Sequence, residues 1–589
     1  MLEQLESNGI RGARRLVVAA CVFFAAGCQG LAPGRTEAEG NRFEPTWTLG
    51  ANTAPARGQN GMVASDDSLA TAVGGQVLER GGNAVDAAVA VAFALAVTHP
   101  EAGNIGGGGF MLVHLADGTT AALDFRERAP AAATRDMFSR PGAPPGASTR
   151  AHLASGVPGS VAGMLAAVER FGTLPARAAI APAIKLAREG FTVDATFRDG
   201  IAGQRSRIAA HAGAALFLPE REPPALGTTF RQPDLARTLE LIARDGADAF
   251  YTGPIAELIV AEMRRGGGLI TAADLAGYEV TWRPPLRTRY RGHTVIGMAP
   301  PSSGGIAVAA MLNILETFDR LPAFGTARHA HLVAAAQQRA FLDRNELIGD
   351  PDVALVPTNR LTSKRYAQRV ARTIDPARAA STRAARAAMR EGNETTHIAV
   401  ADNSGNVVSL TTTINDIYGS GVFVEDAGFF LNDEMDDFAL RPGTVNADGI
   451  VAAEANAIAP GKVMMSSMAP TIVLDPEGRV LLVLGSRGGP RIISSVVQVI
   501  VNVIDHGMPL VDAMRAPRVH HVVSPDTLWY EPRGFAPAVL HDLGAMGYEL
   551  KPIRTDTLPY IGRVIAVGRR GTGWEGVADP RFSGSAAGH

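Results

Sequence analysis

Two segments rich in β-branched residues lie close together in the sequence: Thr395-Thr396-His397-Ile398-Ala399-Val400-Ala401-Asp402 and Val407-Val408-Ser409-Leu410-Thr411-Thr412-Thr413-Ile414-Asn415. The four residues Asn403-Ser404-Gly405-Asn406 connect them. A short glycine-containing connection between two such segments is typical of a β-hairpin. We therefore expect antiparallel strands over 395–402 and 407–415.

The two faces of this hairpin differ in polarity. Side chains alternate along a strand, so the even positions form an apolar face, whereas the odd positions form a polar one. The polar face contains Thr395, His397, Ala399, Ala401, Ser409, Thr411, Thr413 and Asn415. Facing residues must share parity, which favours a loop at 404–406 and predicts the pairs His397–Thr413 and Thr395–Asn415. The hairpin alone favours a solvated face, and contact with a substrate is the alternative.

Length and charge limit the classes of protein. A chain of 589 residues exceeds one ordinary core, which indicates several units or one large α/β body in two halves. The chain has 56 basic and 58 acidic residues and a net charge of −2. It therefore offers no basic field for a phosphate backbone, which argues against nucleic acid as a partner.

The amino-terminal residues have the pattern of a targeting segment. Three arginines at positions 11, 14 and 15 precede an apolar run over 16–26, which ends at Gly27-Cys28. This pattern predicts a bacterial lipoprotein signal over 1–28, with a lipid on Cys28 and a periplasmic, membrane-anchored location. A cleaved periplasmic signal is the alternative.

The next residues, 29–57, lack apolar periodicity and predict a flexible tether. Cys21 and Cys28 are the only cysteines, so no disulfide is expected after processing.

Helices and strands are mixed through the rest of the chain. We expect a buried helix at 84–98, too short to span a membrane, and strands at 110–114 and 119–125. Residues 150–350 are predicted to be mainly helical, and 366–390 to form an exposed linker. The remaining expectations are helices near 176–189, 233–249, 255–266, 326–346 and 491–506, and strands at 421–424, 427–432, 470–475 and 480–485.

The glycine run Gly106-Gly107-Gly108-Gly109 permits two interpretations. A phosphate-binding loop would need Lys-Ser/Thr after the glycines and then a helix, whereas a strand is predicted here. A tight crossing of two backbones is the better interpretation.

Several separated motifs resemble those of the γ-glutamyltransferases, and the resemblance covers about residues 60 to 582. It implies a four-layer αββα sandwich of the N-terminal-nucleophile hydrolase type. It also implies self-cleavage before Thr395 into a large chain, 58–394, and a small chain, 395–589, which stay associated. The motifs are Asp124-Phe125-Arg126-Glu127, Pro301-Ser302-Ser303-Gly304-Gly305, Thr395-Thr396-His397, Asn432-Asp433-Glu434-Met435-Asp436-Asp437-Phe438, Ser466-Ser467-Met468-Ala469-Pro470 and Gly485-Ser486-Arg487-Gly488-Gly489.

The resemblance also implies a catalytic centre. Thr395 would be the nucleophile, and its α-amino group, freed by the cut, would be the base that a weak hydroxyl nucleophile needs. Thr413 would hydrogen-bond the Thr395 hydroxyl. Gly488 and Gly489 would donate backbone N–H groups to the oxyanion of acyl transfer. His397, at a strand start, is more readily structural than catalytic.

The same resemblance implies a pocket for a γ-glutamyl group. Arg126 would bind the α-carboxylate with help from Ser466 and Ser467, a task suited to a planar guanidinium. Three further residues, Asn415, Glu434 and Asp437, would receive the α-ammonium. No metal or cofactor is needed, and 432–437 lacks the spacing of a calcium loop.

The implied activity is transfer of the γ-glutamyl group of glutathione, or a related amide, to water, an amino acid or a peptide. A glutaryl or cephalosporin acylase on the same scaffold is the first alternative, although two buried carboxylates would oppose an apolar acyl chain. A non-catalytic surface lipoprotein is the second. In the lid-like stretch 441–449, Asp448 stands where some relatives carry an aromatic gate.

Overall fold

The structure is a computed structural model that describes residues 43–381, 394–442, 454–523, 526–553 and 560–589. The expected signal over 1–28, with Cys21 and Cys28, lies outside these residues. So do the first part of the expected tether and most of the lid-like stretch, including Asp448. Within the described ranges, no helix combines the length and the apolar character that a membrane crossing requires.

The predicted hairpin is confirmed as β10 (Glu394–Ala401) and β11 (Val407–Asn415), which pair antiparallel. The predicted register is wrong by two residues, because Thr395 faces Thr413 and His397 faces Thr411. The strands were expected to close around a loop at 404–406, and they close one residue earlier.

The turn chemistry explains this shift. The Asp402 N–H donates to the Asn406 carbonyl at 3.0 Å, and the Asp402 carboxylate accepts from the N–H groups of Ser404 at 2.9 Å and Asn406 at 3.0 Å. Gly405, with φ +90°, takes the last position of the three-residue loop, where positive φ is required.

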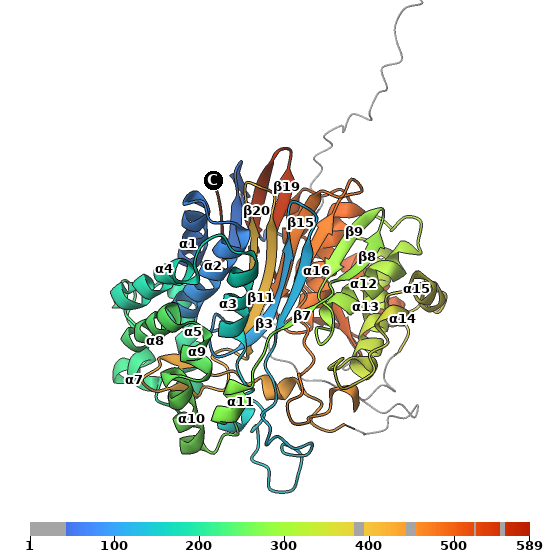
Figure 1. The fold of residues 1–589 in the computed structure, drawn as a ribbon. Coiled ribbons are helices and arrows are strands. Elements are labelled where there is room, and N and C mark those ends of the chain that lie inside the picture. Colours follow the sequence, from blue (N-terminus) through green and yellow to red (C-terminus); the bar gives the residue numbers. More distant parts are fainter. Residues whose placement is uncertain (1–42, 382–393, 443–453, 524–525, 554–559) are drawn as a thin grey trace, which may run out of the picture. The chain divides into compact units, whose positions relative to one another are not determined.

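Two seven-stranded sheets form the centre of the molecule (Figure 1). Every strand pair within these two sheets is antiparallel. The first sheet has the order β21 (Ser585–Gly588), β2 (Met62–Ser65), β10, β11, β3 (Gly108–His114), β4 (Thr120–Phe125) and β7 (Thr281–Arg283). The second has the order β1 (Ala56–Gly58), β20 (Gly573–Ala578), β19 (Arg563–Arg570), β15 (Val480–Arg487), β14 (Thr471–Leu474), β9 (His293–Gly297) and β8 (Leu286–Tyr290).

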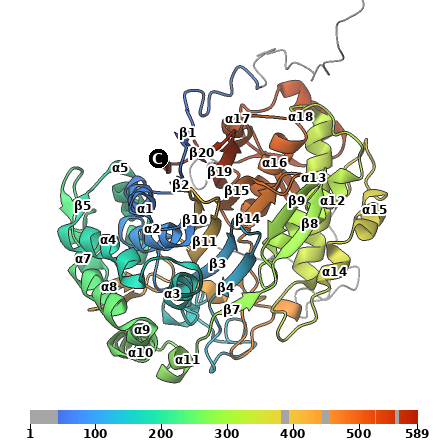
Figure 2. The same ribbon diagram turned by 45° about the horizontal axis from the view of Figure 1, so that its top comes forward.

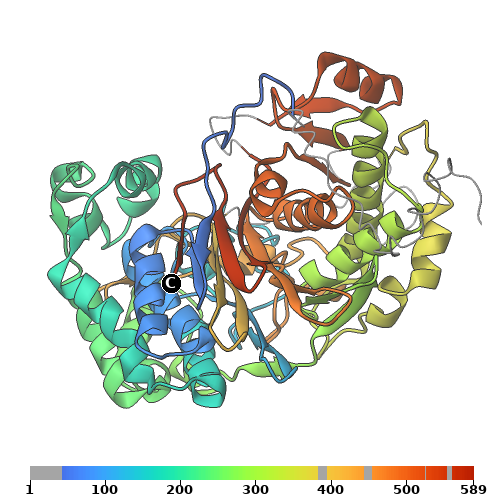
Figure 3. The same cartoon turned by 90° about the horizontal axis from the view of Figure 1, so that it is seen from above.

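Helices cover the outer face of each sheet, which confirms the four-layer αββα arrangement (Figures 2 and 3). The first sheet is covered by α1 (Ser68–Glu79), α2 (Ala84–Thr98) and α3 (Ser160–Phe171), with α4 (Ala176–Glu189) and α8 (Pro233–Asp245) further out. The second is covered by α12 (Gly304–Glu316) and α16 (Arg491–Ile504), with α13 (Ala327–Leu347) packed on α12.

Smaller elements complete the fold. Further helices include α5 (Ala195–Gly203), α9 (Ala247–Tyr251), α10 (Pro254–Gly266), α11 (Ala272–Ala276), α15 (Lys364–Ala371), α17 (Leu510–Arg515) and α18 (Pro537–Ala545). A three-stranded sheet contains β16 (Val519–Val522), β17 (Thr527–Tyr530) and β18 (Leu550–Pro552), and a two-stranded one contains β12 (Phe423–Val424) and β13 (Phe429–Phe430).

The two faces of the β10–β11 hairpin enter different layers. Its apolar face, including Ile398 and Leu410, packs with α2 in one hydrophobic core. Its polar face packs against the second sheet, where the Ser409 hydroxyl donates to the Leu484 carbonyl at 3.1 Å. The His397 ring rests on Gly485, where an added Cβ would lie 2.4 Å from it. The solvated interpretation of this face is therefore wrong, because both strands are buried throughout.

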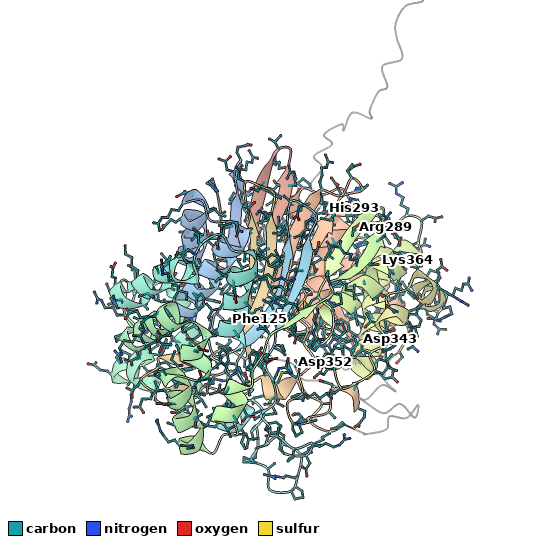
Figure 4. All side chains as sticks on the ribbon, viewed as in Figure 1. Phe125, Arg289, His293, Asp343, Asp352 and Lys364 are labelled. Carbon is teal, nitrogen blue, oxygen red and sulfur yellow. The ribbon has the colours of Figure 1, made fainter. Side chains whose placement is uncertain are left out.

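Some of the other expectations are confirmed, and others are not. The helix at 84–98 is confirmed as α2, and the glycine run is a tight crossing, since a Cβ on Gly107 would lie 2.1 Å from the Thr413 carbonyl. Residues 150–350 also contain the strands β7, β8 and β9, which were not expected. The predicted linker begins as helix α15, whose Lys364 contacts the Arg289 carbonyl on the edge strand β8 (Figure 4).

Part of the expected tether belongs to the folded body. Phe43 and Trp47 are buried, and the Trp47 indole N–H donates to the Arg515 carbonyl at 2.8 Å. Strand β1 then pairs with β20. The described residues 43–57 are therefore anchored to the folded body at Phe43, at Trp47 and through β1, because the two aromatic side chains pack against the second sheet and its helices.

Candidate active site

A pocket opens at the end of the hairpin where β10 begins and β11 ends. Of the ten residues that the sequence predicted for the site, all but Gly488 line this pocket. Its lining consists of Arg126, Thr395, Thr413, Asn415, Glu434, Asp437, Ser466, Ser467, Met468, Gly489 and Ile492. Segments more than 300 residues apart in the sequence therefore converge on one small volume.

The peptide bond between Glu394 and Thr395 lies beside the pocket, which Thr395 lines. The Thr413 hydroxyl donates to the Glu394 carbonyl at 2.7 Å and accepts from the Asn415 N–H at 2.8 Å. The Thr413 backbone is held in turn by the Asn104 side chain, which donates to the Thr413 carbonyl at 3.0 Å. Thr413 thus polarises the carbonyl beside the proposed cleavage bond. Its expected bond to the Thr395 hydroxyl stays a prediction for the cut chain.

The glycine pair lies where β15 turns into α16. Gly488 and Gly489 have φ values of +122° and +57°, in a region that residues with a Cβ rarely adopt. The Gly488 carbonyl accepts from the Arg491 N–H at 3.2 Å, toward the start of α16. The C=O and N–H of one peptide unit point in opposite directions, so the Gly489 N–H points away from that helix. The backbone can therefore present a donor to the pocket, beside the positive end of the α16 dipole.

Arg126, directly after β4, lies at the charged end of the pocket. Its guanidinium contacts Glu434 at 2.7 Å and also pairs with Asp437. The Asp124 carboxylate accepts from the Arg126 N–H at 3.0 Å and from Arg283 at 2.7 Å. The next partner of Arg283, Asp352, lies at 2.9 Å at the surface (Figure 4). The backbone and the side chain of Arg126 are thus both fixed before any substrate arrives.

The charges around Arg126 do not balance. Three carboxylates, those of Glu127, Glu434 and Asp437, face this one guanidinium. Burial raises the pKa of both Glu127 and Glu434 to about 8, and Arg126 only partly offsets it. The cluster therefore retains at least one proton at neutral pH, and a bound cation would displace it. Among the described residues, no group of three or more His, Cys, Asp or Glu is placed to hold a metal ion.

The two serines of the pocket are held from behind by Arg344, on α13. The Arg344 guanidinium donates to the Ser467 hydroxyl and to the Ser303 hydroxyl, both at 2.8 Å. The Ser303 N–H and hydroxyl both donate to the Ser466 carbonyl at 2.7 Å. Because Ser467 accepts a hydrogen bond from Arg344, its own O–H can donate into the pocket.

His397 takes no part in the pocket lining. It is fully buried, and its Nδ1 lies 2.8 Å from the Thr411 hydroxyl. Burial lowers its pKa to about 3, so the ring is neutral at physiological pH. These contacts agree with the structural role that was favoured for it.

The sequence did not single out the supporting residues Asn104, Asp124, Arg283 and Arg344. Asp124 and Ser303 occur in quoted motifs, but no role was assigned to them. Arg344 and Asn104 give no local signal of this role, because the pocket residues that they contact, Ser467 and Thr413, lie more than 100 residues away in the sequence. Only the pairing of elements in space brings them to the site.

Comparisons with known proteins agree with this geometry. The model of the gamma-glutamyltranspeptidase family matches residues 70–589. A glutathione hydrolase proenzyme of Escherichia coli (strain K12) is 47% identical over 504 residues, which cover 84% of this chain and 87% of that protein. The acylase ACY 1 proenzyme of Pseudomonas sp. (strain SE83) is 41% identical over 475 residues, covering 79% and 83%. The crystal structure of cephalosporin acylase from Bacillus halodurans superposes with a TM-score of 0.81 at 28% identity, covering 91% of this chain and 97% of that chain.

Proposed function

The chain belongs to the gamma-glutamyltranspeptidase family, and on that premise we propose that it removes the γ-glutamyl group from glutathione or a related γ-glutamyl amide. The acyl group passes to water, an amino acid or a peptide. One observation carries this proposal: a threonine that can become a chain end shares a pocket with a guanidinium and an excess of carboxylates. A γ-glutamyl group carries both an α-carboxylate and an α-ammonium, and this pocket offers partners for both.

The proposed reaction starts once Thr395 has a free amine. The amine accepts the proton of the Thr395 hydroxyl, and the oxygen attacks the γ-carbonyl carbon of the donor. The N–H groups of Gly488 and Gly489 stabilise the oxyanion. The C–N bond then breaks and the leaving amine takes the proton. Water or an acceptor amine attacks the resulting γ-glutamyl ester, which returns the Thr395 hydroxyl.

The substrate's charged groups would exchange with contacts that the side chains of the pocket make with one another. The α-carboxylate would bind Arg126 and the hydroxyls of Ser466 and Ser467. The α-ammonium would bind the carboxylates of Glu434 and Asp437, with Asn415 beside them. Binding of the zwitterion would then move Arg126 from its present carboxylate partners to the substrate carboxylate, and the substrate ammonium would replace Arg126 beside Glu434 and Asp437.

The acylase relative supports a second candidate, an acylase for glutaryl or cephalosporin amides. Such acyl groups lack the α-ammonium, so they would leave Glu434 and Asp437 without a cationic partner from the substrate. Matched γ-glutamyl and glutaryl p-nitroanilides distinguish the two candidates. We expect kcat/KM to favour the γ-glutamyl amide by at least about 100-fold, the cost of leaving one buried charge unpaired. A preference for the glutaryl amide would replace the proposed function with the acylase.

Maturation is a separate part of the proposal. The wild-type chain should yield a large chain ending at Glu394 and a small chain of residues 395–589, whereas Thr395→Ala should neither mature nor turn over substrate. An intact wild-type chain on a denaturing gel would support the non-catalytic surface protein instead. We also propose the lipid on Cys28 and the periplasmic location. The mass of the purified large chain tests both, because it reports signal removal and any attached lipid.

A further inference from the structure

Arg487 links the residue before the proposed cleavage bond to the residues of the expected oxyanion site. It directly precedes Gly488, and its guanidinium pairs with the carboxylate of Glu394. Its other contacts are Glu101 at 3.1 Å, His99 at 3.1 Å and the face of the Phe582 ring, whose centroid lies 4.5 Å away. Arg487 and Glu394 are each 2% exposed. A buried ion pair therefore joins the first strand residue of β10 to the last of β15.

This pair crosses between the two sheets. Strand β10 belongs to the first sheet and β15 to the second, and they meet at the middle of the sandwich. Burying two charged side chains is unfavourable, and a buried pair offsets this only with good geometry. Such a pair is weak evidence for added stability. A role in fixing geometry is therefore the better explanation for its position beside the proposed cleavage bond.

The backbone ladder does not fix this position by itself. The regular pairing of β10 with β11 is interrupted between Glu394 and Thr395: Thr395 faces Thr413, whereas Glu394 faces Asn415. Asn415 itself has a φ of +76°. Two side-chain contacts add to the pairing of Glu394 with Asn415 here: the Thr413 hydroxyl donates to the Glu394 carbonyl, and Arg487 pairs with its carboxylate.

We propose that Arg487 is a positioning residue for self-cleavage, which holds Glu394 so that the Thr395 hydroxyl can reach its carbonyl carbon. This inference rests on the proposed function. In the step that it serves, the Thr395 oxygen bonds to the Glu394 carbonyl carbon and the C–N bond breaks. The hydroxyl proton moves to the nitrogen, which becomes the free amine. Water then hydrolyses the Glu394–Thr395 ester, giving the Glu394 α-carboxylate and the Thr395 hydroxyl.

The Arg487–Glu394 pair should serve self-cleavage and not the acyl-transfer reaction of the mature enzyme. Glu394 has no part in the acyl-transfer reaction, because the cut makes it the end of the large chain. Arg487 keeps Glu101 as a partner. Burial opposes ionisation of Glu101, but the charges of His99 and Arg487 hold its pKa below the ordinary value, so it stays an anion. Loss of the Arg487–Glu394 pair should therefore slow the cut far more than it slows the mature enzyme.

The test measures the rate of the cut in freshly synthesised full-length chains, followed on denaturing gels, for wild type, Glu394→Gln and Arg487→Gln. Both variants should mature at least about tenfold more slowly, and the double variant no more slowly than the slower single one. The fraction that does mature should show a kcat/KM within about twofold of wild type for Glu394→Gln. Replacement of the pair Arg479–Asp475, in which Arg479 is exposed and Asp475 is partly buried, by Gln and Asn is the matched control, with no change expected.

The outcomes separate the possible failures. A Glu394→Gln chain that matures at the wild-type rate overturns the inference, even if Arg487→Gln does not fold. Equal losses of maturation and of kcat/KM in Arg487→Gln also overturn it, because a general structural defect predicts that result. Thermal unfolding in the uncut Thr395→Ala background shows whether each variant folds. A wild-type chain that is never cut would instead contradict the proposed function.

Discussion

Two buried charge clusters in this molecule are built from the same residue types and balance differently. In one, Arg518 and Arg581 share Asp579, and Arg581 also binds Glu531 at 2.6 Å. Two cations there meet two anions. In the pocket, Arg126 meets three carboxylates.

The effect on acidity follows the balance of charge. Burial opposes ionisation of Asp579, but Arg518 and Arg581 lower its pKa below the ordinary value. In the pocket, burial raises the pKa of Glu434 to about 8. A buried cluster that balances its own charges is complete without a ligand, whereas one with excess charge needs a partner from outside. The comparison identifies the first cluster as structural and the second as a binding site.

The largest expected effect comes from removing the cation of the pocket. Arg126→Ala should lower kcat/KM for a γ-glutamyl anilide by about 100- to 4,000-fold, because removal of one partner of a buried charge pair costs about 3–5 kcal/mol. The melting temperature should change little, since the nearby carboxylates can take up protons. Steady-state kinetics and thermal unfolding of the same preparation check both points. If Arg126→Ala instead lowers the melting temperature strongly, the Arg126 cluster is structural, like the cluster of Arg518 and Arg581.

The opposite pattern is expected for the balanced cluster. Arg581→Ala should lower the free energy of unfolding by about 3–5 kcal/mol, because Glu531 and Asp579 would remain buried with too little positive charge. Turnover per folded molecule should not change, because Arg581 lies outside the pocket lining. Denaturant unfolding and active-site titration measure the two quantities. Loss of turnover without loss of stability would contradict the division between the clusters.

A pH series sharpens the comparison further. Free Glu434, with its pKa near 8, is largely protonated at pH 6.5, and the substrate ammonium favours its ionised form. KM should therefore fall by up to about tenfold between pH 6.5 and 8, whereas Glu434→Gln should show little of this dependence. The Thr395 amine must also be neutral to act as a base, so kcat should rise over the same range in both proteins. A KM that falls equally in the variant would assign the dependence to another group.

The smallest effect concerns the inner part of the hairpin. His397 has its pKa lowered to about 3 in the folded chain, so between pH 6.5 and 3 the unfolded chain binds more protons. Stability is therefore lost as pH falls, by up to about 1.4 kcal/mol per pH unit from this one group. His397→Asn should show a weaker acid dependence in denaturant unfolding at pH 7, 6 and 5. Equal slopes in both proteins would show that His397 does not contribute.

The sequence predicted local features well and long-range ones poorly. Alternation along 395–415 predicted which side chains share a face, because a period of two is a local property. The register failed because it depended on the Asp402 carboxylate and Gly405 in the turn. Strands β8 and β9 were missed within a mainly helical region, and their place in the second sheet depends on pairing with β14, far along the chain.

The candidate site shows the same limit. Motif resemblance supplied Arg126, Thr395 and the glycine pair, since each motif keeps its own residues in order. It assigned no role to Arg344. This side chain reaches Ser467 because its helix, α13, packs on α12, which covers the second sheet. Asp124 stood in a quoted motif, but its hold on the Arg126 backbone became visible only in three dimensions. The residues expected to contact the substrate could be predicted from sequence motifs, whereas the residues that position them became visible only in the fold.

The strand order has a consequence for the life of the processed protein. Each sheet draws strands from both sides of the proposed cut: β10, β11 and β21 lie beside β2, β3, β4 and β7, while β14, β15, β19 and β20 lie beside β1, β8 and β9. The uncut chain contains all the strands of each sheet, and the cut divides these strands between two chains. After denaturation neither piece carries a full set, so recovery would need a bimolecular search through partly formed sheets. The lifetime of the mature protein would therefore depend on a slow rate of unfolding, because the two chains would not readily refold together once unfolded.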